Sequence, residues 1–225
     1  MRNTRFTDRH EAGRQLAEAL HSWAANADVI VLGLPRGGVP VAAEVAKRLD
    51  APLDVFIVRK LGVEGHEELA MGAVATGGVR VLNRDVIDGM GISAEAVDRV
   101  TAMERAELVR RERAYRGTSA PPTLHGRVVV LVDDGLATGS TMLAAVAAVL
   151  AQHPLRIIVA VPVASAEACA AIRRQADECV CVSCPDPFYG VGMWYEDFSQ
   201  TSDQEVQQLL EAAQRRRAPP AAAHA

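Results

Sequence analysis

The chain has 225 residues, of which 49% are hydrophobic, 23% charged and only 4% aromatic, and its formal net charge is −4. This length suffices for one full hydrophobic core, and the weak negative charge gives no general affinity for nucleic acid or membrane surfaces. Because the first residues lack the apolar stretch of a signal peptide and no apolar run is long enough to span a bilayer, we expect a cytoplasmic protein.

The first segments alternate between helix and strand patterns. Apolar residues recur at helical spacing over residues 8–25, and the short apolar run over residues 29–34 indicates a buried strand. A helix is expected over residues 39–49 and a second buried strand over residues 53–58. This strand–helix–strand order is a βαβ unit, which implies a parallel sheet.

Residues 59–68 interrupt this alternation. They contain two glycines and many charges without a clear period, so we expect a mobile loop. Two short strands follow over residues 72–76 and 79–82, with Gly77-Gly78 as their hairpin turn.

A long helix is predicted over residues 94–116, with Ser93 as its N-cap. Its Glu and Arg residues pair at i,i+4 spacing, which favours a solvated helix face over a binding surface. We interpret residues 84–117 as a helical insertion.

The second half returns to the α/β alternation. Strands are expected over residues 128–132, 157–161 and 179–183, with helices over residues 140–152 and 166–175. The basic, then Ala- and Pro-rich tail over residues 215–225 is expected to be disordered. The prediction is an α/β fold in a single domain of residues 1–214, with its core over about residues 26–184.

Three of the four cysteines, Cys179, Cys181 and Cys184, form a C-x-C-x-x-C cluster, and the fourth is Cys169. The first two lie in an expected strand, and no second Cys or His pair stands at zinc-finger spacing. The pattern favours buried structural cysteines over a metal site.

An acidic turn follows the expected strand over residues 128–132. Asp133 and Asp134 come first, and the small residues from Gly135 to Thr141 lead into a helix. Ligands of parallel sheets bind beyond the carboxyl ends of strands, and a helix N-terminus offers N–H groups and a positive dipole end to a phosphate. The carboxylates suit sugar hydroxyls or magnesium. The segment therefore predicts a ribose-5-phosphate site, and it matches neither a Walker loop nor a dinucleotide motif.

Residues 129–141, V-V-L-V-D-D-G-L-A-T-G-S-T, resemble the signature with which type I phosphoribosyltransferases bind 5-phosphoribosyl diphosphate (PRPP). Gly135 departs from the aliphatic residue usual there. The resemblance implies the type I fold, a mostly parallel sheet flanked by helices with a small hood, and Mg²⁺-dependent transfer of the phosphoribosyl group to a nitrogen base. It also implies that Asp133 and Asp134 hold the ribose hydroxyls, directly or through Mg²⁺. The phosphate would lie on Ala137, Thr138, Gly139, Ser140 and Thr141.

Three other segments resemble parts of the same site. Arg36-Gly37-Gly38 resembles the pyrophosphate loop, and Arg59-Lys60 begins a segment like the family's flexible catalytic loop, where both cations would meet the leaving pyrophosphate. Residues 185–200, with the N-terminal helix, resemble the hood of 6-oxopurine enzymes, in which Phe188 would stack on the base. The plainer interpretations are an ordinary βα turn, a solvated basic pair and a hydrophobic cap.

The signals for the acceptor conflict. Ala137 stands where hypoxanthine-guanine enzymes carry an Asp that acts as a base. The sequence A-T-G over residues 137–139 therefore looks more like that of adenine enzymes, whereas the hood looks more like that of 6-oxopurine enzymes. Glu67 and Glu68 are other candidates for a base. We expect a homodimer that uses PRPP and a nitrogenous acceptor. The alternative is a PRPP- or nucleotide-sensing regulator, but basic residues concentrate only at 110–116 and 215–217, which argues against a nucleic-acid partner.

Overall fold

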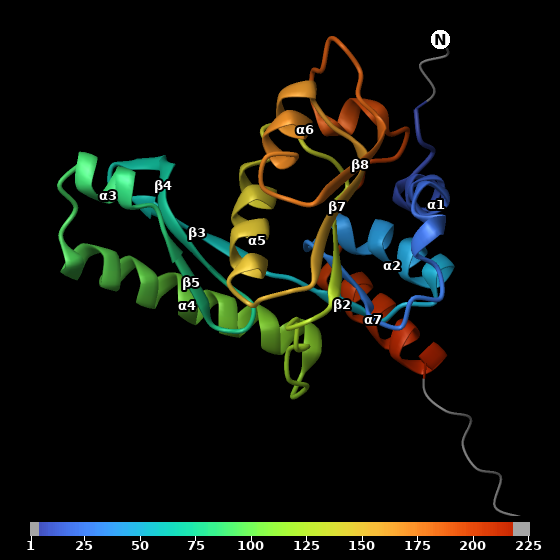
Figure 1. Cartoon of the computed structure of the whole chain (residues 1–225), viewed down its shortest axis with the longest axis horizontal. Coiled ribbons are helices and arrows are strands. Elements are labelled where there is room, and N and C mark those ends of the chain that lie inside the picture. The colour runs from blue at the N-terminus through green and yellow to red at the C-terminus, as the bar shows by residue number, and fades with distance from the viewer. Residues whose placement is uncertain (1–4, 218–225) are drawn as a thin grey trace, which may run out of the picture.

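The computed structural model describes residues 5–217, apart from the side chains of residues 67 and 68 (Figure 1). Its main sheet has five parallel strands in the order β2-β1-β6-β7-β8. The strands are β1 (Val29–Gly33), β2 (Leu53–Val55), β6 (Val128–Val132), β7 (Arg156–Val163) and β8 (Glu178–Ser183). The parallel sheet expected from the βαβ pattern is therefore present.

Helices cover both faces of this sheet, as Figure 1 shows. One face packs on α1 (Arg9–Ala19), α2 (Gly38–Leu49) and α7 (Asp203–Arg217), and the other on α5 (Ser140–Leu150) and α6 (Ala166–Ile172). Successive residues of a strand serve opposite faces, so Val31 belongs to the first core and Leu32 to the second. All residues of β1 and β6 are buried, which explains their continuous apolar sequences.

A second, antiparallel sheet extends from one side of the domain (Figure 1). It contains β3 (Val58–Val63), β4 (His66–Ala75) and β5 (Val79–Leu82), and α3 (Arg84–Gly89) and α4 (Ala94–Arg116) follow it. The helices expected within residues 84–117 are thus present. Ser93 caps α4 by accepting a hydrogen bond from Ala96, and Gly77-Gly78 makes the β4–β5 turn at positive φ, as expected.

The expectation that residues 59–68 form a loop is wrong. Those residues lie in the β3–β4 hairpin, whose turn contains Gly65 at φ +79°. Leu61 and Val63 are buried and belong to the same core as Leu108 of α4. Leu61 and Val63 are two positions apart, as expected for one buried face of a strand, but the charged residues around them make this alternation hard to recognise in the sequence. The strand expected over residues 53–58 is also divided, because β2 ends at Val55 and the chain then enters the second sheet.

The tail expected to be disordered from residue 215 begins instead with the last turn of α7, and residues 218–225 lie outside the described residues. Val206 and Leu210 bury one side of α7, and Arg216 donates hydrogen bonds to the carbonyls of Ala46 and Ala51 at 3.1 and 3.2 Å. Acidic residues in the first turn and arginines in the last also suit the helix dipole. None of the helices within residues 5–217 is long and apolar enough to cross a membrane.

The N-terminal segment joins the residues that follow β8. Phe6 forms a parallel bridge with Tyr195, and their ring centroids lie 5.5 Å apart. With Ala12, Val163 and Trp194, these two residues form a small core of their own. The short 3₁₀ helix η2 (Val191–Trp194) lies in this segment, and a second one, η1 (His21–Trp23), ends the region expected to be one long first helix.

Candidate active site

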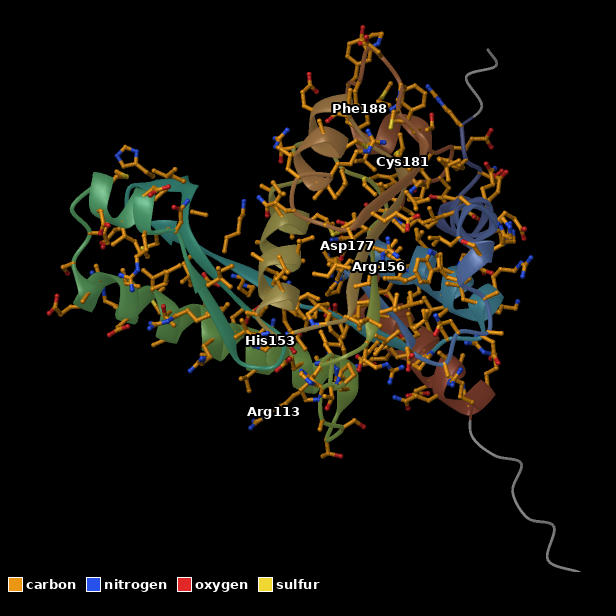
Figure 2. All side chains as sticks on the ribbon, in the orientation of Figure 1. Arg113, His153, Arg156, Asp177, Cys181 and Phe188 are labelled. Atoms are coloured by element: carbon orange, nitrogen blue, oxygen red, sulfur yellow. The ribbon has the colours of Figure 1, made fainter. Side chains whose placement is uncertain are left out.

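The predicted site segments meet at the carboxyl edge of the parallel sheet. Figure 2 shows Phe188, which follows β8, near the top of the view, well above Asp177 and Arg156, which stand at the amino ends of β8 and β7. At this edge Leu34 donates a backbone hydrogen bond to Val132 at 2.9 Å. The loops after β1 and β6 are therefore neighbours, and Val191 of the segment after β8 lies against Gly135 of the β6 loop.

Asp134 is bound by an arginine of the N-terminal helix. Its Oδ2 atom lies 2.9 Å from both Nε and Nη2 of Arg9, and the two side chains are 15% and 11% exposed. Arg9 also donates to the Ser199 carbonyl at 2.7 Å and lies 4.1 Å from the ring centroid of Phe198. One carboxylate of the acidic pair is thus already neutralised.

Asp133 differs from its neighbour because it takes part in no ion pair within residues 5–217. Its Oδ1 atom accepts the backbone N–H of Asp134 at 2.9 Å. Burial raises the pKa of Asp133 well above its usual range, and the charge of Asp134 adds to this rise. Burial also raises the pKa of Asp134, although Arg9 opposes it. Within the described part of the chain, Asp133 therefore lacks a paired counter-charge.

The glycines after β1 lie directly against this acidic pair. A Cβ atom on Gly37 would overlap Asp134 Oδ2, and one on Gly38 would come within 2.7 Å of the Val132 carbonyl oxygen. Any larger residue would push the loop away from the carboxylates. The two glycines therefore keep Arg36 and its loop beside the acidic pair, which an ordinary βα turn would not require.

The loop between β6 and α5 has the geometry of an anion site. Gly139 adopts φ +72° immediately before α5 begins, and the residues on either side of it are exposed. The Ser140 N–H donates to Thr138 Oγ1 at an N···O distance of 3.4 Å. Exposed N–H groups and hydroxyls therefore surround the positive end of the helix dipole. The exposed residues are Ala137, Thr138, Ser140 and Thr141.

Gly135, where the family usually has an aliphatic residue, has a packing explanation. A Cβ atom there would lie 2.6 Å from Val191 Cγ1 and 3.0 Å from Val163 Cγ1. The segment containing η2 therefore packs tightly against the acidic turn. The glycine makes room for this contact and removes no group that faces a ligand.

A cavity of about 680 Å³ separates the phosphate loop from the segment after β8. Ala137 and Thr138 form one wall and Phe188, half-buried, belongs to the other. Tyr195 is buried instead, and its hydroxyl donates to the Asp134 carbonyl at 2.6 Å. The hydrophobic-cap interpretation therefore holds for Tyr195 and for the buried Trp194, whereas Phe188 both packs against their small core and lines the cavity.

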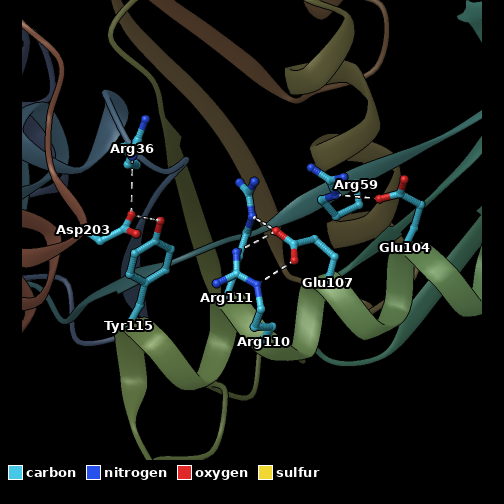
Figure 3. A network of polar contacts seen from close by, with 8 residues as sticks. All are labelled: Arg36, Arg59, Glu104, Glu107, Arg110, Arg111, Tyr115 and Asp203. Atoms are coloured by element: carbon cyan, nitrogen blue, oxygen red, sulfur yellow. Dashed lines mark hydrogen bonds and ion pairs between the residues drawn. The ribbon is translucent and has the colours of Figure 1, made fainter.

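A cationic cleft of about 380 Å³ lies between Arg36 and helix α4 (Figure 3). Arg36 contributes from that loop, and Arg110 and Arg111 contribute from α4. Both helix arginines bind Glu107 at 2.7 Å, and these hydrogen bonds lower the pKa of that carboxyl to about 2. Arg36 lies 3.7 Å from Asp203, a longer and weaker ion pair. The three arginines together suit a strongly anionic ligand.

Tyr115 borders the same cleft. Its hydroxyl donates to Asp203 at 2.8 Å, and burial, followed by this hydrogen bond, raises the pKa of Tyr115 to about 12. The tyrosine is therefore a neutral hydrogen-bond donor at physiological pH.

Arg59 and Lys60 point to different places because successive residues of β3 face opposite sides. Arg59 Nε donates to Glu104 of α4 at 2.6 Å (Figure 3). Lys60 instead lines a cleft of about 540 Å³ together with Ser140, the first residue of α5. The expectation that Arg59 and Lys60 form a pair of cations at the end of a strand is wrong. Both residues lie inside β3, and only Lys60 faces α5, the helix that follows the phosphate loop.

A family model, the phosphoribosyl transferase domain, matches residues 4–197 of the chain. The chain belongs to the phosphoribosyl transferase domain family. Two Mycobacterium tuberculosis relatives, "Putative phosphoribosyl transferase Rv0571c" and its counterpart MT0597, are 50% identical over 211 residues. These cover 93% of this chain but 47% of each relative, so the chain spans about half the length of the curated relatives it matches.

A solved structure, TT1426 from Thermus thermophilus, is 45% identical to this phosphoribosyl transferase domain. The match has a TM-score of 0.83 and covers 92% of this chain and 98% of that one. The family predicted from residues 129–141 and the α/β fold that it implied are confirmed.

The donor set of this phosphoribosyl transferase domain fits magnesium, which the family resemblance implies. Mg²⁺ prefers hard oxygen ligands and is usually held by one or two carboxylates together with substrate phosphates. Asp133 offers such a carboxylate, and no ion pair within residues 5–217 competes for it. Asp134 fits less well as a direct ligand because Arg9 already binds it.

Sequence reasoning missed three cations of this candidate site: Arg9, Arg110 and Arg111. Arg9 gives no signal, because it lies 125 residues from Asp134 and looks like any polar residue of an amphipathic helix. The sequence pattern assigns Arg110 and Arg111 to a solvated face, and their pairing with Glu107 agrees with that interpretation. Only the packing of α4 beside the glycine loop places them next to Arg36.

Proposed function

We propose that the domain transfers a 5-phosphoribosyl group from PRPP to a planar nitrogen base and releases pyrophosphate. One observation carries the proposal: the Asp133 carboxylate, which takes part in no ion pair of the described residues, lies between two anion-binding regions. On one side is the loop of Gly37 and Gly38, next to the cleft lined by three arginines. On the other side is the N-terminus of α5, which suits a phosphate. Family membership supports the same reaction class.

The ligand's parts correspond to the three regions of the site. The 5-phosphate would bind the N–H groups and hydroxyls of residues 137–141, with Lys60 facing the same helix end. Asp133 would accept hydrogen bonds from the ribose hydroxyls. The pyrophosphate would lie toward the cationic cleft, where it would compete with Glu107 for Arg110 and Arg111.

The reaction breaks the bond between ribose C1 and the pyrophosphate oxygen, which leaves with the electron pair. A nitrogen lone pair of the acceptor forms the new C1–N bond, and the acceptor gives up its proton to solvent or to a base. When bound, Mg²⁺ would neutralise pyrophosphate charge, with Asp133 as its protein ligand. Positive charge develops on the ribose ring, so the Asp133 carboxylate stabilises this state, and Arg36 stabilises the departing anion.

The acceptor site is the cavity between the phosphate loop and Phe188. A purine-like base would stack on the Phe188 ring, with its reacting nitrogen directed toward the ribose. Ala137 supplies no carboxylate to this cavity. Specificity would therefore depend on hydrogen bonds and shape in the segment over residues 185–190.

Phe188→Ala should lower kcat/KM for the acceptor by roughly ten- to a hundredfold, since base stacking on an aromatic ring contributes about 1–3 kcal/mol. Affinity for PRPP should change little, because the phosphate loop remains intact. Steady-state kinetics with each substrate varied in turn separates the two effects. Met103→Ala, which removes an exposed apolar side chain of α4 away from this cavity, is the control and should behave like the wild type. Equal losses for PRPP and acceptor, with a lower melting temperature, would show that Phe188 only caps the core.

Arg36→Gln should weaken PRPP binding by about 1–3 kcal/mol, the range for a charge-assisted hydrogen bond. Ribose 5-phosphate should bind the variant as well as it binds the wild type, because it lacks the pyrophosphate. Calorimetry with both ligands in Mg²⁺ makes this comparison. Arg48→Gln, which removes an exposed ion pair with Glu18, should affect neither ligand. An equal loss of both ligands in Arg36→Gln would contradict the assignment, and PRPP binding without turnover in the wild type would favour the regulator.

A further inference from the structure

Three cysteine thiols from separate parts of the chain meet beside the proposed acceptor cavity. Cys169 comes from α6, Cys181 from β8 and Cys184 from the residues just after β8. All three sulfur atoms lie within 4.8 Å of one another, and those of Cys169 and Cys184 are 3.5 Å apart. Cys169 is buried, whereas Cys184 is exposed, so the interpretation of these residues as buried structural cysteines is wrong for Cys184.

This spacing matches that of thiolates around one metal ion. Sulfur ligands about 2.3 Å from a tetrahedral Zn²⁺ stand roughly 3.8 Å from each other. Structural and catalytic zinc sites both use thiolates, and three protein ligands leave one position open. Because Cys184 is exposed, that fourth position would face solvent.

The arrangement of the thiols favours one metal ion over a disulfide. A disulfide joins only two sulfur atoms, at about 2.05 Å, whereas three sulfur atoms meet here and those of Cys169 and Cys184 stand 3.5 Å apart. A thiophilic cation would bind all three sulfur atoms and displace their protons.

We propose that Cys169, Cys181 and Cys184 form a three-thiolate site for a thiophilic d¹⁰ cation of the Zn²⁺ type. Ions of this class prefer sulfur ligands, whereas Mg²⁺ requires oxygen, so the site is distinct from the acidic pair. The proposal does not depend on the transferase reaction.

The position of the site gives the metal a structural consequence. Ser165, the N-cap of α6, donates to the Ala137 carbonyl at 2.7 Å and so connects the helix of Cys169 to the phosphate loop. Cys184 immediately precedes Pro185, which lines the cavity with Phe188. A metal bound to both cysteines would therefore fix the two walls of that cavity relative to each other.

The test is metal binding by the reduced, metal-free 225-residue chain. Titration of Zn²⁺ against a chromophoric chelator should give one ion per chain, and Co²⁺ should give thiolate charge-transfer absorption in the near ultraviolet. Cys184→Ser is the principal variant because its exposed side chain can be replaced without disturbing the core. It should lower Zn²⁺ affinity at least about a hundredfold, as loss of one of three ligands implies.

Cys179→Ser is the matched control, since Cys179 lies in the same strand as Cys181 but outside the group of three. It should bind Zn²⁺ like the wild type, and Cys181→Ser should behave like Cys184→Ser. The proposal is overturned if the reduced wild type binds no Zn²⁺ in the micromolar range or tighter, or if Cys184→Ser binds it unchanged. Equal loss in Cys179→Ser would also contradict the three-thiol assignment.

Discussion

Asp133→Asn should reduce kcat/KM for phosphoribosyl transfer at least about a hundredfold and raise the melting temperature of the ligand-free protein. The kinetic loss follows because an amide cannot stabilise positive charge on the ribose ring or bind Mg²⁺ as a carboxylate does; such interactions contribute about 3 kcal/mol. The gain in stability follows because the variant removes a half-buried carboxylate that takes part in no ion pair within residues 5–217.

The raised pKa of Asp133 determines how the difference in stability between the wild type and the variant changes with pH. The pKa of Asp133 is raised in the folded protein, so its protonated form is favoured there and its ionised form opposes folding. The stability contributed by the protonated group is fully present below the ordinary carboxyl pKa, about 4, and is lost as pH rises through the raised pKa. The variant's advantage in melting temperature should therefore be clear at neutral pH and vanish under acid conditions.

Melting curves and initial rates across pH, for wild type and variant, test both parts. Asp134→Asn is the matched control, because it removes the neighbouring carboxylate but also leaves Arg9 without its partner, and should therefore lose stability. A variant at Asp133 that turns over like the wild type, or melts lower at neutral pH, would contradict the account.

Arg9→Gln should destabilise the fold by about 3 kcal/mol, because removing one partner of a largely buried ion pair leaves the other charge uncompensated. For a domain of this size, that loss corresponds to a drop in melting temperature of roughly 6–12 °C. PRPP affinity should fall as well, since Asp134 and the adjoining Gly37 would lose their fixed position.

Thermal denaturation of three variants distinguishes the loss of the Arg9–Asp134 ion pair from a general effect of removing a positive charge. Arg80→Gln removes an exposed ion pair with Asp98 and should cost less than about 1 kcal/mol. The double variant Arg9→Gln/Asp134→Asn should recover part of the stability lost in Arg9→Gln. Equal melting temperatures for Arg9→Gln and Arg80→Gln would show that the pair has no special role.

Local patterns in the sequence are enough to predict the parallel sheet and the loop at its edge. The strand over residues 128–132, the N-cap Ser93 and the turn at Gly77-Gly78 each depend on neighbouring residues, and the structure contains all three. The acidic turn followed by small residues is equally local. These features can therefore be predicted without knowledge of tertiary contacts.

Features that depend on tertiary contacts are missed or misjudged. The sequence predicts a loop where the β3–β4 hairpin lies, because charged residues and glycines surround Leu61 and Val63, while α4 supplies surface that buries them. Arg9 and Arg111 reach the site only through helix packing. Cys169 joins the cysteine cluster although it lies 15 residues from Cys184.

Pyrophosphate release measured with the purified chain, PRPP, Mg²⁺ and a panel of nucleobases tests the proposed reaction most directly. The account predicts release that requires a planar nitrogen base, produces the matching nucleotide in equal amount, and is lost in Asp133→Asn. PRPP binding without release for any base would contradict the transferase and support a sensor. Release that proceeds equally well without a base would also contradict it, because water would then be the acceptor.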